Sequence, residues 1–232
     1  MFAVVTGATS GIGRELMRVF EEHGFDVFGV GEEFDLATPE GVEALHAAID
    51  RPVDVLAHNA GVSKGDAFLA GDVEGHLRLV DLNVRGVVHL ARLLLPDMVG
   101  RGSGRVLFTS SIVATMPGPF QSTYNASKSF VQSFGVALRD ELRDSGVTVT
   151  LLMPGPTETP IFARARQQDT LLGASDHKDD PADVARQGFE ALMDGRERVA
   201  TASLLMKAAE VANRFMPEPV KTRINRLIAR PR

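Results

Sequence analysis

A glycine-rich turn near the start of the chain constrains the fold more than any other feature. Residues 2–6 (FAVVT) form a short apolar run typical of a buried strand, and a helical pattern begins at residue 14. Between them lie Gly7, Gly11 and Gly13, in the spacing Gly-x-x-x-Gly-x-Gly. Glycines let a phosphate approach the backbone, and the free N–H groups at a helix start attract its charge. Three glycines can also make a simple tight connection, but this position favours a nucleotide site.

The rest of the chain alternates between apolar runs and helical patterns. Helical stretches such as residues 74–98 and 122–144 separate runs of strand length, with no internal repeat. This order predicts an α/β fold with a doubly wound, Rossmann-like parallel sheet, helices on both faces and ligands at the carboxyl ends of the strands. The expected buried strands lie at residues 4–5, 27–30, 53–56, 106–108, 147–152 and 199–200.

Composition excludes several kinds of site and partner. A length of 232 residues fits one domain with a sizeable core, and a formal net charge of -5 gives no reason to expect nucleic acid. Because the chain has no cysteine, it has no disulfide and no thiolate site, and its six histidines are scattered, so no metal is expected. The first strand begins at residue 2 and no apolar run approaches membrane-spanning length, so we expect a soluble cytoplasmic protein.

The only tyrosine of the chain, Tyr124, precedes Lys128 by four residues in a helical segment. On a helix, this spacing puts both side chains on one face, one turn apart. A free tyrosine titrates near ~10, so lowering its pKa to roughly 7 needs about 4 kcal/mol. A nearby cation in a poorly solvated pocket could supply this and create an acid/base for a substrate hydroxyl or carbonyl. The same spacing also occurs where a surface tyrosine lies beside a solvated lysine.

Five motifs, in the same order, resemble those of the short-chain dehydrogenase/reductase family. The resemblance extends over roughly residues 2–202. Each motif alone is a weak indication of the family, but five motifs in the same order are a strong one. In one of them His58 stands where the family has the first of two asparagines. The matching segments are residues 6–13 (TGATSGIG), 58–61 (HNAG), 83–86 (NVRG), the pair Ser111 and Tyr124, and 154–159 (PGPTET).

This resemblance implies an oxidoreductase that moves a hydride between NAD(P) and a carbonyl or secondary alcohol. Tyr124 would pass the proton, Ser111 would hold and polarise the substrate oxygen, and Lys128 would bind the nicotinamide ribose and lower the pKa of Tyr124. Asn83 would order a water that connects Lys128 to solvent. Ser110 is the alternative to Ser111, and either serine could simply cap local backbone. The implied cofactor contacts are Gly7, Thr9, Ser10, Gly11, Ile12, Gly13, Glu32, Asp35, Leu36, Asn59, Ala60, Gly61, Tyr124, Lys128, Pro154, Gly155, Thr157 and Thr159.

The region after the second strand departs from the family pattern. Only three residues separate Gly31 from Asp35 and Leu36, whereas the family usually has a helix and a third strand before an Asp that contacts adenine. We therefore expect the third strand to be short or missing and the adenine side of the pocket to be open. The next helix is expected at residues 39–49, with Thr38 as its cap. Asp35 could contact adenine or be only a turn residue.

The same region bears on the choice of cofactor. An acidic side chain near the end of the second strand accepts hydrogen bonds from ribose hydroxyls and repels a 2′-phosphate. Glu32 and Glu33 lie near that place, no basic residue does, and Arg14 is expected to point elsewhere. The sequence therefore favours NAD over NADP.

Two further segments bear on substrates and partners. Residues 161–180 are expected to form a lid over a pocket for a medium-sized, fairly hydrophobic alcohol or ketone. Residues 1–202 would be the catalytic domain and 203–232 a helical extension. The expected apolar contacts are Phe162, Leu171 and Leu172 from the lid, and Met116, Pro117 and Phe120 from the opposite wall.

The extension ends in a basic amphipathic segment with Val220, Ile224 and Leu227 on its apolar side. Such helices can lie on anionic membranes, but packing on the domain or across a subunit interface is favoured, because no acyl site or aromatic anchor accompanies the charges. An apolar stripe at Phe130, Phe134, Leu138 and Leu142 fits core packing or, by resemblance, contact with a second copy. We expect a homodimer and consider a tetramer doubtful.

Two functions remain open from the sequence. A dinucleotide-binding regulator or sensor could keep the same fold without turnover, because fold does not determine function. The missing helix and third strand on the adenine side of the pocket favour this alternative. The complete set of Asn83, Ser111, Tyr124 and Lys128 favours the enzyme.

Overall fold

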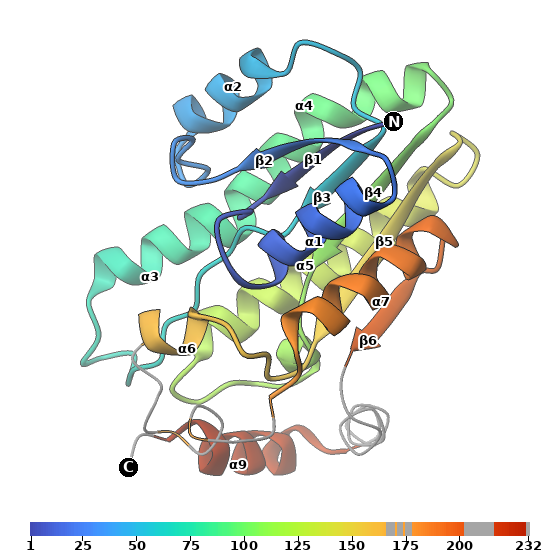
Figure 1. Cartoon of the computed structure of the whole chain (residues 1–232). Coiled ribbons are helices and arrows are strands. Elements are labelled where there is room, and N and C mark those ends of the chain that lie inside the picture. Colours follow the sequence, from blue (N-terminus) through green and yellow to red (C-terminus); the bar gives the residue numbers. More distant parts are fainter. Residues whose placement is uncertain (166–169, 171–173, 175–177, 202–215, 231–232) are drawn as a thin grey trace.

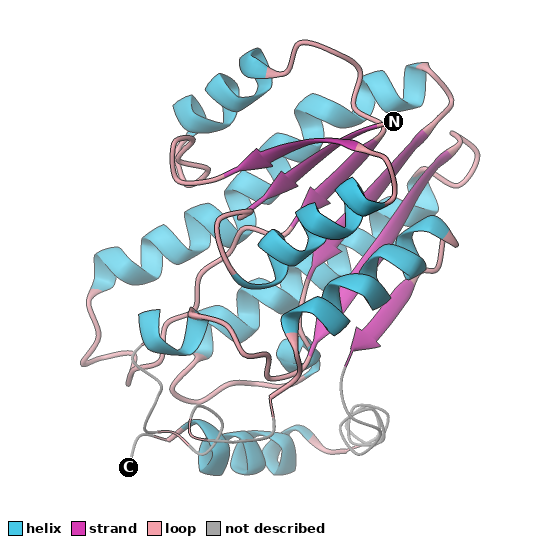
Figure 2. Ribbon diagram, in the orientation of Figure 1, coloured by secondary structure: helices cyan, strands magenta, loops and turns pink. Residues whose placement is uncertain are grey.

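The computed structural model describes residues 1–165, 170, 174, 178–201 and 216–230. Within them, six parallel strands form one sheet in the order β2-β1-β3-β4-β5-β6 (Figures 1 and 2). Each predicted strand is present, and the predicted α/β fold with a parallel sheet is confirmed. The strands are β1 (Phe2–Thr6), β2 (Asp26–Val30), β3 (Val55–His58), β4 (Gly104–Thr109), β5 (Val147–Pro154) and β6 (Arg198–Thr201).

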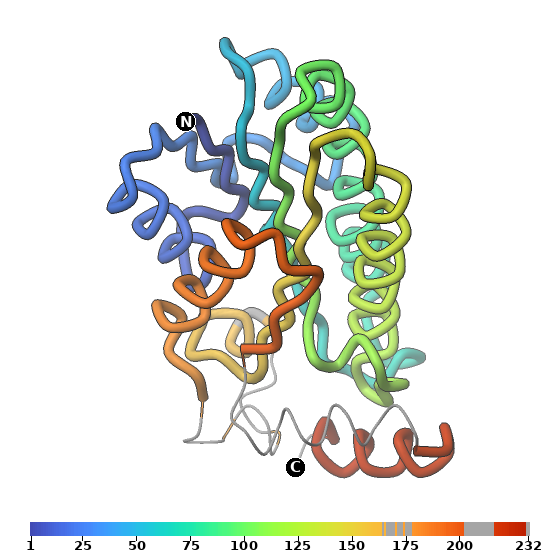
Figure 3. Tube along the Cα trace, turned by 90° about the vertical axis from the view of Figure 1, so that its right-hand side faces the viewer, coloured from blue at the N-terminus to red at the C-terminus, as the bar shows by residue number. Residues whose placement is uncertain are grey.

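Helices cover both faces of the sheet (Figure 3). Helices α1 (Gly11–Glu22) and α7 (Pro181–Met193) pack together on one face, and α4 (Val87–Gly100) and α5 (Ser122–Glu141) cover the other. Helix α2 (Pro39–Ala48) packs on α4. The other described helical segments are α3 (Val73–Val80), the π-helical turn η1 (Asp81–Gly86), the 3₁₀ turn η2 (Ile112–Thr115), α6 (Ile161–Arg164) and α9 (Glu218–Ala229).

Alternating side chains of the strands divide the core into two layers. In β1, Ala3 and Val5 pack with residues of α1 and α7, whereas Val4 packs with residues of α2 and α4. By the same alternation, Val55 and Leu56 of β3 belong to different layers of the core. Because both faces of the sheet are covered, the strands are continuous apolar runs in the sequence.

Along the sequence, no strand lies between β2 and β3. Residues 31–54 are all described and contain one helix, α2, so β2 is an edge of the sheet. Thr38 caps α2 as predicted, since its hydroxyl oxygen accepts a 3.1 Å hydrogen bond from the N–H of Gly41. The expectation of a short or missing third strand is therefore confirmed.

The helix predicted at residues 74–98 is interrupted by η1. Within this turn, Asn83 accepts a 3.0 Å hydrogen bond from the N–H of Val62 and donates one of 2.9 Å to its carbonyl oxygen. Gly86 lies against Leu36, whose carbonyl oxygen would be 2.2 Å from a Cβ at this position. A π-helical turn rotates the side chains that follow it, so both contacts form within a nearly continuous helix. The 3.6-residue spacing of apolar residues, from which the helix was predicted, does not reveal such a turn.

Helix α9 is the described part of the predicted extension, at the lower edge of the molecule in Figure 1. The helix predicted before Pro217 falls within residues 203–215, outside the described residues, and the domain boundary stays a prediction. Lys221, Asn225 and Ala229 are buried in α9, whereas Leu227 is 67% exposed. The helix thus contacts the domain through a largely polar face. No helix in the described ranges is long and apolar enough to cross a membrane.

Candidate active site

An open pocket of about 840 Å³ lies at the carboxyl ends of the strands. It extends from the turn between β1 and α1 to α9, and its size is typical of small-molecule sites. Gly13 and Asn83 do not border it. The predicted residues in its wall are Gly7, Thr9, Ser10, Gly11, Ile12, Glu32, Asp35, Leu36, Asn59, Ala60, Gly61, Ser110, Ser111, Tyr124, Lys128, Pro154, Gly155, Thr157 and Thr159.

Backbone geometry explains the three glycines of the first turn. Gly7 and Gly11 have φ angles of 69° and 54°, in the left-handed region that glycine adopts most readily. A Cβ on Gly13 would lie 2.1 Å from the carbonyl oxygen of Gly7, so only glycine fits here and closes the turn. The side chain of Ser10 caps no N–H group of α1. The first N–H groups of this helix are therefore available to an anion such as a pyrophosphate.

Thr6 joins the ends of β1 and β3 beneath the pocket. Its hydroxyl oxygen accepts hydrogen bonds of 3.0 and 2.9 Å from the N–H groups of Asn59 and Ala60. The loop after β5 closes the same region, because the Cγ2 atom of Thr159 lies 2.8 Å from where Gly11 would carry a Cβ. Three predicted motifs thus meet around one end of the pocket.

Tyr124, on α5, and Ser111, which follows β4 and caps η2, both border the pocket. The hydroxyl of Ser111 donates a 3.4 Å hydrogen bond to the carbonyl oxygen of Pro154. Burial raises the pKa of Tyr124 to about 12, and hydrogen bonding with Ser111 acts in the opposite direction. The sequence led us to expect a lowered pKa, but desolvation of the phenolate outweighs the favourable contact. The hydroxyl of Ser110 donates to the carbonyl oxygen of Lys128 at 3.0 Å and holds α5 in place.

Lys128 is buried below Tyr124. Its Nζ donates a 2.9 Å hydrogen bond to the carbonyl oxygen of Thr109 and lies 5.9 Å from the centroid of the Tyr124 ring. Burial lowers the pKa of Lys128 to about 8. His58 is buried as well, and burial together with the charge of Lys128 lowers its pKa to about 4. Between pH values of about 4 and 8, His58 is therefore neutral while Lys128 is charged.

The side chains of Asn83 and Lys128 both approach Gly61. A Cβ on Gly61 would be 3.2 Å from Oδ1 of Asn83 and 3.3 Å from Nζ of Lys128. Asn83 also donates a 3.1 Å hydrogen bond to the hydroxyl of Ser127. This hydrogen bond connects η1 to α5 beside Lys128. The water that Asn83 was expected to order stays a prediction.

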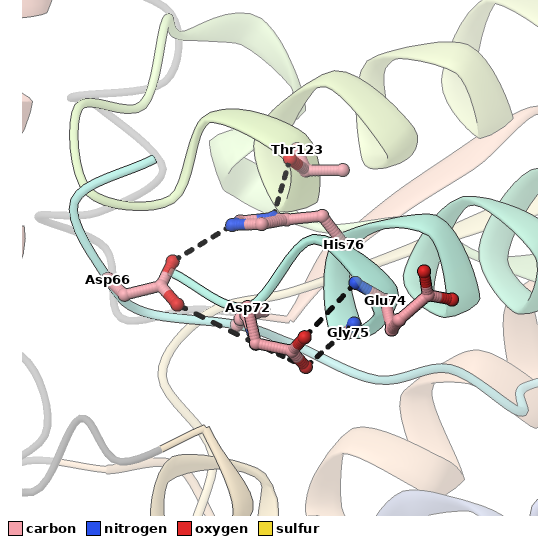
Figure 4. Close-up of polar contacts among 7 residues, drawn as sticks. Asp66, Asp72, Glu74, Gly75, His76 and Thr123 are labelled. Atoms are coloured by element: carbon pink, nitrogen blue, oxygen red, sulfur yellow. Dashed lines mark hydrogen bonds and ion pairs between the residues drawn. The ribbon is translucent and has the colours of Figure 1, made fainter. Parts of the chain in front are cut away.

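A buried histidine braces the first turn of α5 (Figure 4). Nδ1 of His76, in α3, lies 2.9 Å from the hydroxyl oxygen of Thr123, and its Nε2 lies 3.1 Å from Oδ1 of Asp66. Asp72 caps the start of α3. Because Thr123 directly precedes Tyr124, this contact fixes the backbone on which the phenol is carried.

The opposite end of the pocket contains a charge pair that no local motif indicated. Arg78 of α3 donates two hydrogen bonds of 3.0 Å to the carboxylate of Asp35, and both residues border the pocket. Pairing with Arg78 lowers the pKa of Asp35. The carboxylate of Glu33 turns back to accept a 2.8 Å hydrogen bond from the N–H of Gly31. The prediction that no basic residue lies near this end was wrong, because the topology brings Arg78 there from α3.

Helix α9 closes the end of the pocket beyond Tyr124. Asn225 donates a 3.0 Å hydrogen bond to the carbonyl oxygen of Pro117, and the guanidinium of Arg226 lies 5.9 Å from the centroid of the Phe120 ring. The large apolar side chains that border this end are Met116, Ile161, Phe162, Met216, Ile224 and Ile228.

Comparison with known proteins decides the family. The family model described as "short chain dehydrogenase" matches residues 30–170, more than half of the chain. The chain belongs to the short-chain dehydrogenase/reductase family. Among curated proteins, dehydrogenase/reductase SDR family member 7B of Rattus norvegicus is 31% identical, over 92% of this chain and 77% of the relative. An NADP-dependent 3-hydroxy acid dehydrogenase of Salmonella typhi is 30% identical, over 72% of this chain and 76% of the relative.

A solved short-chain dehydrogenase/reductase structure is similar as well. Actinorhodin polyketide ketoreductase with NADPH is 30% identical and aligns with a TM-score of 0.79, over 88% of this chain and 97% of that chain.

Sequence reasoning on this short-chain dehydrogenase/reductase missed Arg78, Gln121 and Asn225, which all border the pocket. Gln121 could have been found, because it lies three residues before Tyr124. Arg78 and Asn225 have no local signal, since tertiary packing alone brings them to the pocket. Leu171 and Leu172 of the predicted lid lie outside the described residues. In the described ranges, no group of three or more His, Asp or Glu side chains could hold a metal ion.

Proposed function

We propose that this short-chain dehydrogenase/reductase transfers a hydride between NAD(P) and a carbonyl or secondary alcohol. The observation that carries the proposal is the position of Tyr124, Ser111 and Lys128 at one end of a pocket that begins at the glycine turn. A phenol, a hydroxyl and a buried ammonium group around one cleft suit proton exchange with a substrate oxygen.

Each residue is given the role that its chemistry allows. Ser111 holds the substrate oxygen, and Tyr124 donates a proton to it in reduction or accepts one in oxidation. Lys128 contributes a buried positive charge that favours the ionised phenol once the substrate replaces water. The N–H groups at the start of α1 would hold the pyrophosphate, and Thr157 and Thr159 would help to hold the nicotinamide, which would supply the hydride.

We propose NADP(H) as the first cofactor to test and NAD(H) as the second. A relative named as NADP-dependent and a similar structure with NADPH support this order. Arg78 supports it too, because a basic group near the adenine end can contact a 2′-phosphate. Glu32, which borders the pocket, is the observation that favours NAD. The preference for NAD drawn from the sequence gains no support from these relatives.

A homodimer is proposed from the exposed apolar side chains on adjacent helices. Val73 and Leu77 on α3 and Phe130 on α5 are all exposed, and α3 contacts α5. Exposed apolar patches of this kind mark contact surfaces.

The second candidate is a dinucleotide sensor without turnover. It is favoured by the raised pKa of Tyr124 and by the missing third strand beside the adenine end. A sensor would bind the cofactor and respond to it without consuming it.

The test is a panel of ketones and alcohols assayed with NADPH, NADP, NADH and NAD. Wild type is compared with Tyr124→Phe and with Ser122→Ala, an exposed neighbour on α5 that serves as the control. We expect turnover by wild type and by the control and loss of at least a hundredfold in Tyr124→Phe, since acid–base catalysis contributes about 10²–10⁴-fold. Undiminished activity in Tyr124→Phe would refute the assignment, and cofactor binding without turnover on the panel would favour the sensor.

A further inference from the structure

Helix α9, at the lower margin of the molecule in Figures 1 and 3, carries an exposed apolar stripe. Its members Val220, Ile224 and Leu227 are 45%, 40% and 67% exposed. Because they are spaced by four and three residues, they lie on one face of the helix. Helix α9 packs on the domain through another face, which contains the buried Asn225 and Ala229. The packing expected for this segment therefore leaves the apolar stripe exposed.

Three arginines lie beside this apolar stripe. Arg223, Arg226 and Arg230 are exposed, and among the residues that the structure describes no carboxylate pairs with them. A turn of about 100° per residue places them on the flank of α9 next to the stripe. The acidic residue of this helix, Glu218, is paired with Lys221 at 3.2 Å. The unpaired charges of α9 are therefore all positive, although the chain has a formal net charge of -5.

The loop that contacts α9 extends this surface without adding charge. Residues 112–120 (IVATMPGPF) contain no charged side chain. Asn225 of α9 donates a 3.0 Å hydrogen bond to the carbonyl oxygen of Pro117, which is itself exposed. The ring of Phe120 lies 5.9 Å from the guanidinium of Arg226. Because α9 contains no aromatic residue, the loop supplies the aromatic group that the helix lacks.

An anionic lipid surface fits this combination better than two other partners do. Amphipathic helices that lie on membranes place their apolar side chains among the acyl chains and their basic side chains among the headgroups. In a symmetric contact between two copies of α9, the same three arginines would face one another and repel. Nucleic acid would neutralise the arginines but leave Leu227, the most exposed member of the stripe, without an apolar partner.

The size of this surface predicts weak and reversible binding. One arginine near an anionic membrane strengthens binding roughly fivefold. Covering a half-exposed valine, isoleucine or leucine contributes a factor of about the same size. Three contributions of each kind predict a partition coefficient on the order of 10⁴ M⁻¹, comparable to that of a single myristoyl chain. A protein held in this way exchanges between lipid and water.

We propose that α9 docks this protein on an anionic lipid surface. The pocket lies against the same helix, since Ile224 and Ile228 border it. Docking would therefore bring the apolar end of the pocket next to the bilayer, into which apolar molecules partition. The docking does not depend on the proposed reaction, and it is measured without cofactor or substrate.

The test is sedimentation of the full chain with vesicles of two compositions. One contains phosphatidylcholine alone, and the other contains an equimolar mixture of phosphatidylcholine and phosphatidylglycerol. We expect a partition coefficient on the order of 10⁴ M⁻¹ for the mixed vesicles. The value for phosphatidylcholine should be roughly a hundredfold lower, because the three arginines lose their anionic partners. High salt should weaken binding to the mixed vesicles. Equal binding to both kinds of vesicle, or binding to neither, would overturn the proposal.

Two pairs of variants test whether α9 is the docking surface. Leu227→Gln and Arg223→Gln should each weaken binding to the mixed vesicles roughly fivefold, because each removes one contribution. Leu69→Gln and Arg143→Gln are the matched controls, since Leu69 is 96% exposed and Arg143 is exposed, both outside α9. Both controls should bind the mixed vesicles as wild type does. Melting temperatures check that all four variants fold.

The same variants identify the other partners if the proposal is wrong. Equal losses in the α9 variants and in the controls would show that binding does not depend on α9. A lower mass of Leu227→Gln than of wild type, measured by light scattering without lipid, would show that the stripe joins two copies. Binding of a DNA duplex that is weakened by Arg223→Gln and unchanged by Leu227→Gln would assign the arginines to nucleic acid. Each of these three results would overturn the proposal.

Discussion

The ammonium group of Lys128 donates a 2.9 Å hydrogen bond to the carbonyl oxygen of Thr109, the last residue of β4. In the described residues no carboxylate pairs with this cation. The end of a buried strand therefore supports a charge whose main partner is a single backbone carbonyl. Burial lowers the pKa of Lys128 to about 8, because the charged form loses its hydration.

Replacing Lys128 by Met should change how stability depends on pH. In the unfolded chain the lysine keeps its proton up to about 10.4, and in the folded protein it loses it near 8. The penalty for the buried charge is fully present below pH 8 and disappears as pH rises toward 10. Between pH 7.5 and 9.5, the free energy of unfolding of wild type should rise by about 2 kcal/mol relative to that of Lys128→Met. Urea unfolding at the two pH values measures this, and parallel changes in both proteins would contradict it.

Replacing His58 by Asn, the residue that the family has there, should reduce acid sensitivity. The folded pKa of His58 is about 4, below its unfolded value, so the unfolded chain binds the extra proton first as pH falls. Stability is therefore lost between pH 6.5 and 4, by about 2 kcal/mol at pH 5. Between pH 7 and 5, the free energy of unfolding of His58→Asn should therefore fall by about 2 kcal/mol less than that of wild type, as measured by urea unfolding. An unchanged difference would mean that His58 takes up a proton in the folded protein.

Replacing Arg78 by Ala should affect the two cofactors unequally. If Arg78 contacts the 2′-phosphate, its removal leaves the carboxylate of Asp35 to repel that group. We expect KM for NADPH to rise roughly tenfold and KM for NADH to change little, since a charge-assisted hydrogen bond is worth about 1.5–3 kcal/mol. Asp35→Asn is the matched variant and should lower KM for NADPH. Equal changes for both cofactors would show that Arg78 does not contact the phosphate.

Placing a charge on the exposed face of α3 should break the proposed dimer. Leu77 is 53% exposed on α3, which packs beside α5. Leu77→Arg should halve the mass measured by light scattering after gel filtration, because a buried unpaired charge is costly at an interface. Leu227→Arg, on α9, is the control and should leave the mass unchanged. A monomeric wild type would remove the basis of this prediction.

The sequence predicted the elements that carry a local pattern. The glycine turn, the strand runs and the cap at Thr38 each depend on neighbouring residues, and the structure has them where predicted. The missing third strand was also visible, because only three residues separate Gly31 from Asp35. Such features follow from chain length and side-chain type alone.

Other features depend on contacts between distant segments. The π-helical turn at Asn83 forms because Val62 offers both of its backbone groups, which no helical period can indicate. The pKa of Tyr124 follows from burial that the spacing to Lys128 does not measure. The pair of Asp35 with Arg78 arises between residues 43 positions apart. Each of these requires the fold before it can be seen.

The loss of the third strand has a consequence for assembly and engineering. Strand β2 ends the sheet, and in the described residues no further strand pairs with the outer backbone groups of its five residues. A sheet margin of this kind is a template to which a further strand can add. Grafting a helix and strand between Gly31 and Asp35 should therefore extend the sheet without disturbing Ser111, Tyr124 and Lys128, and would cover the exposed margin of β2.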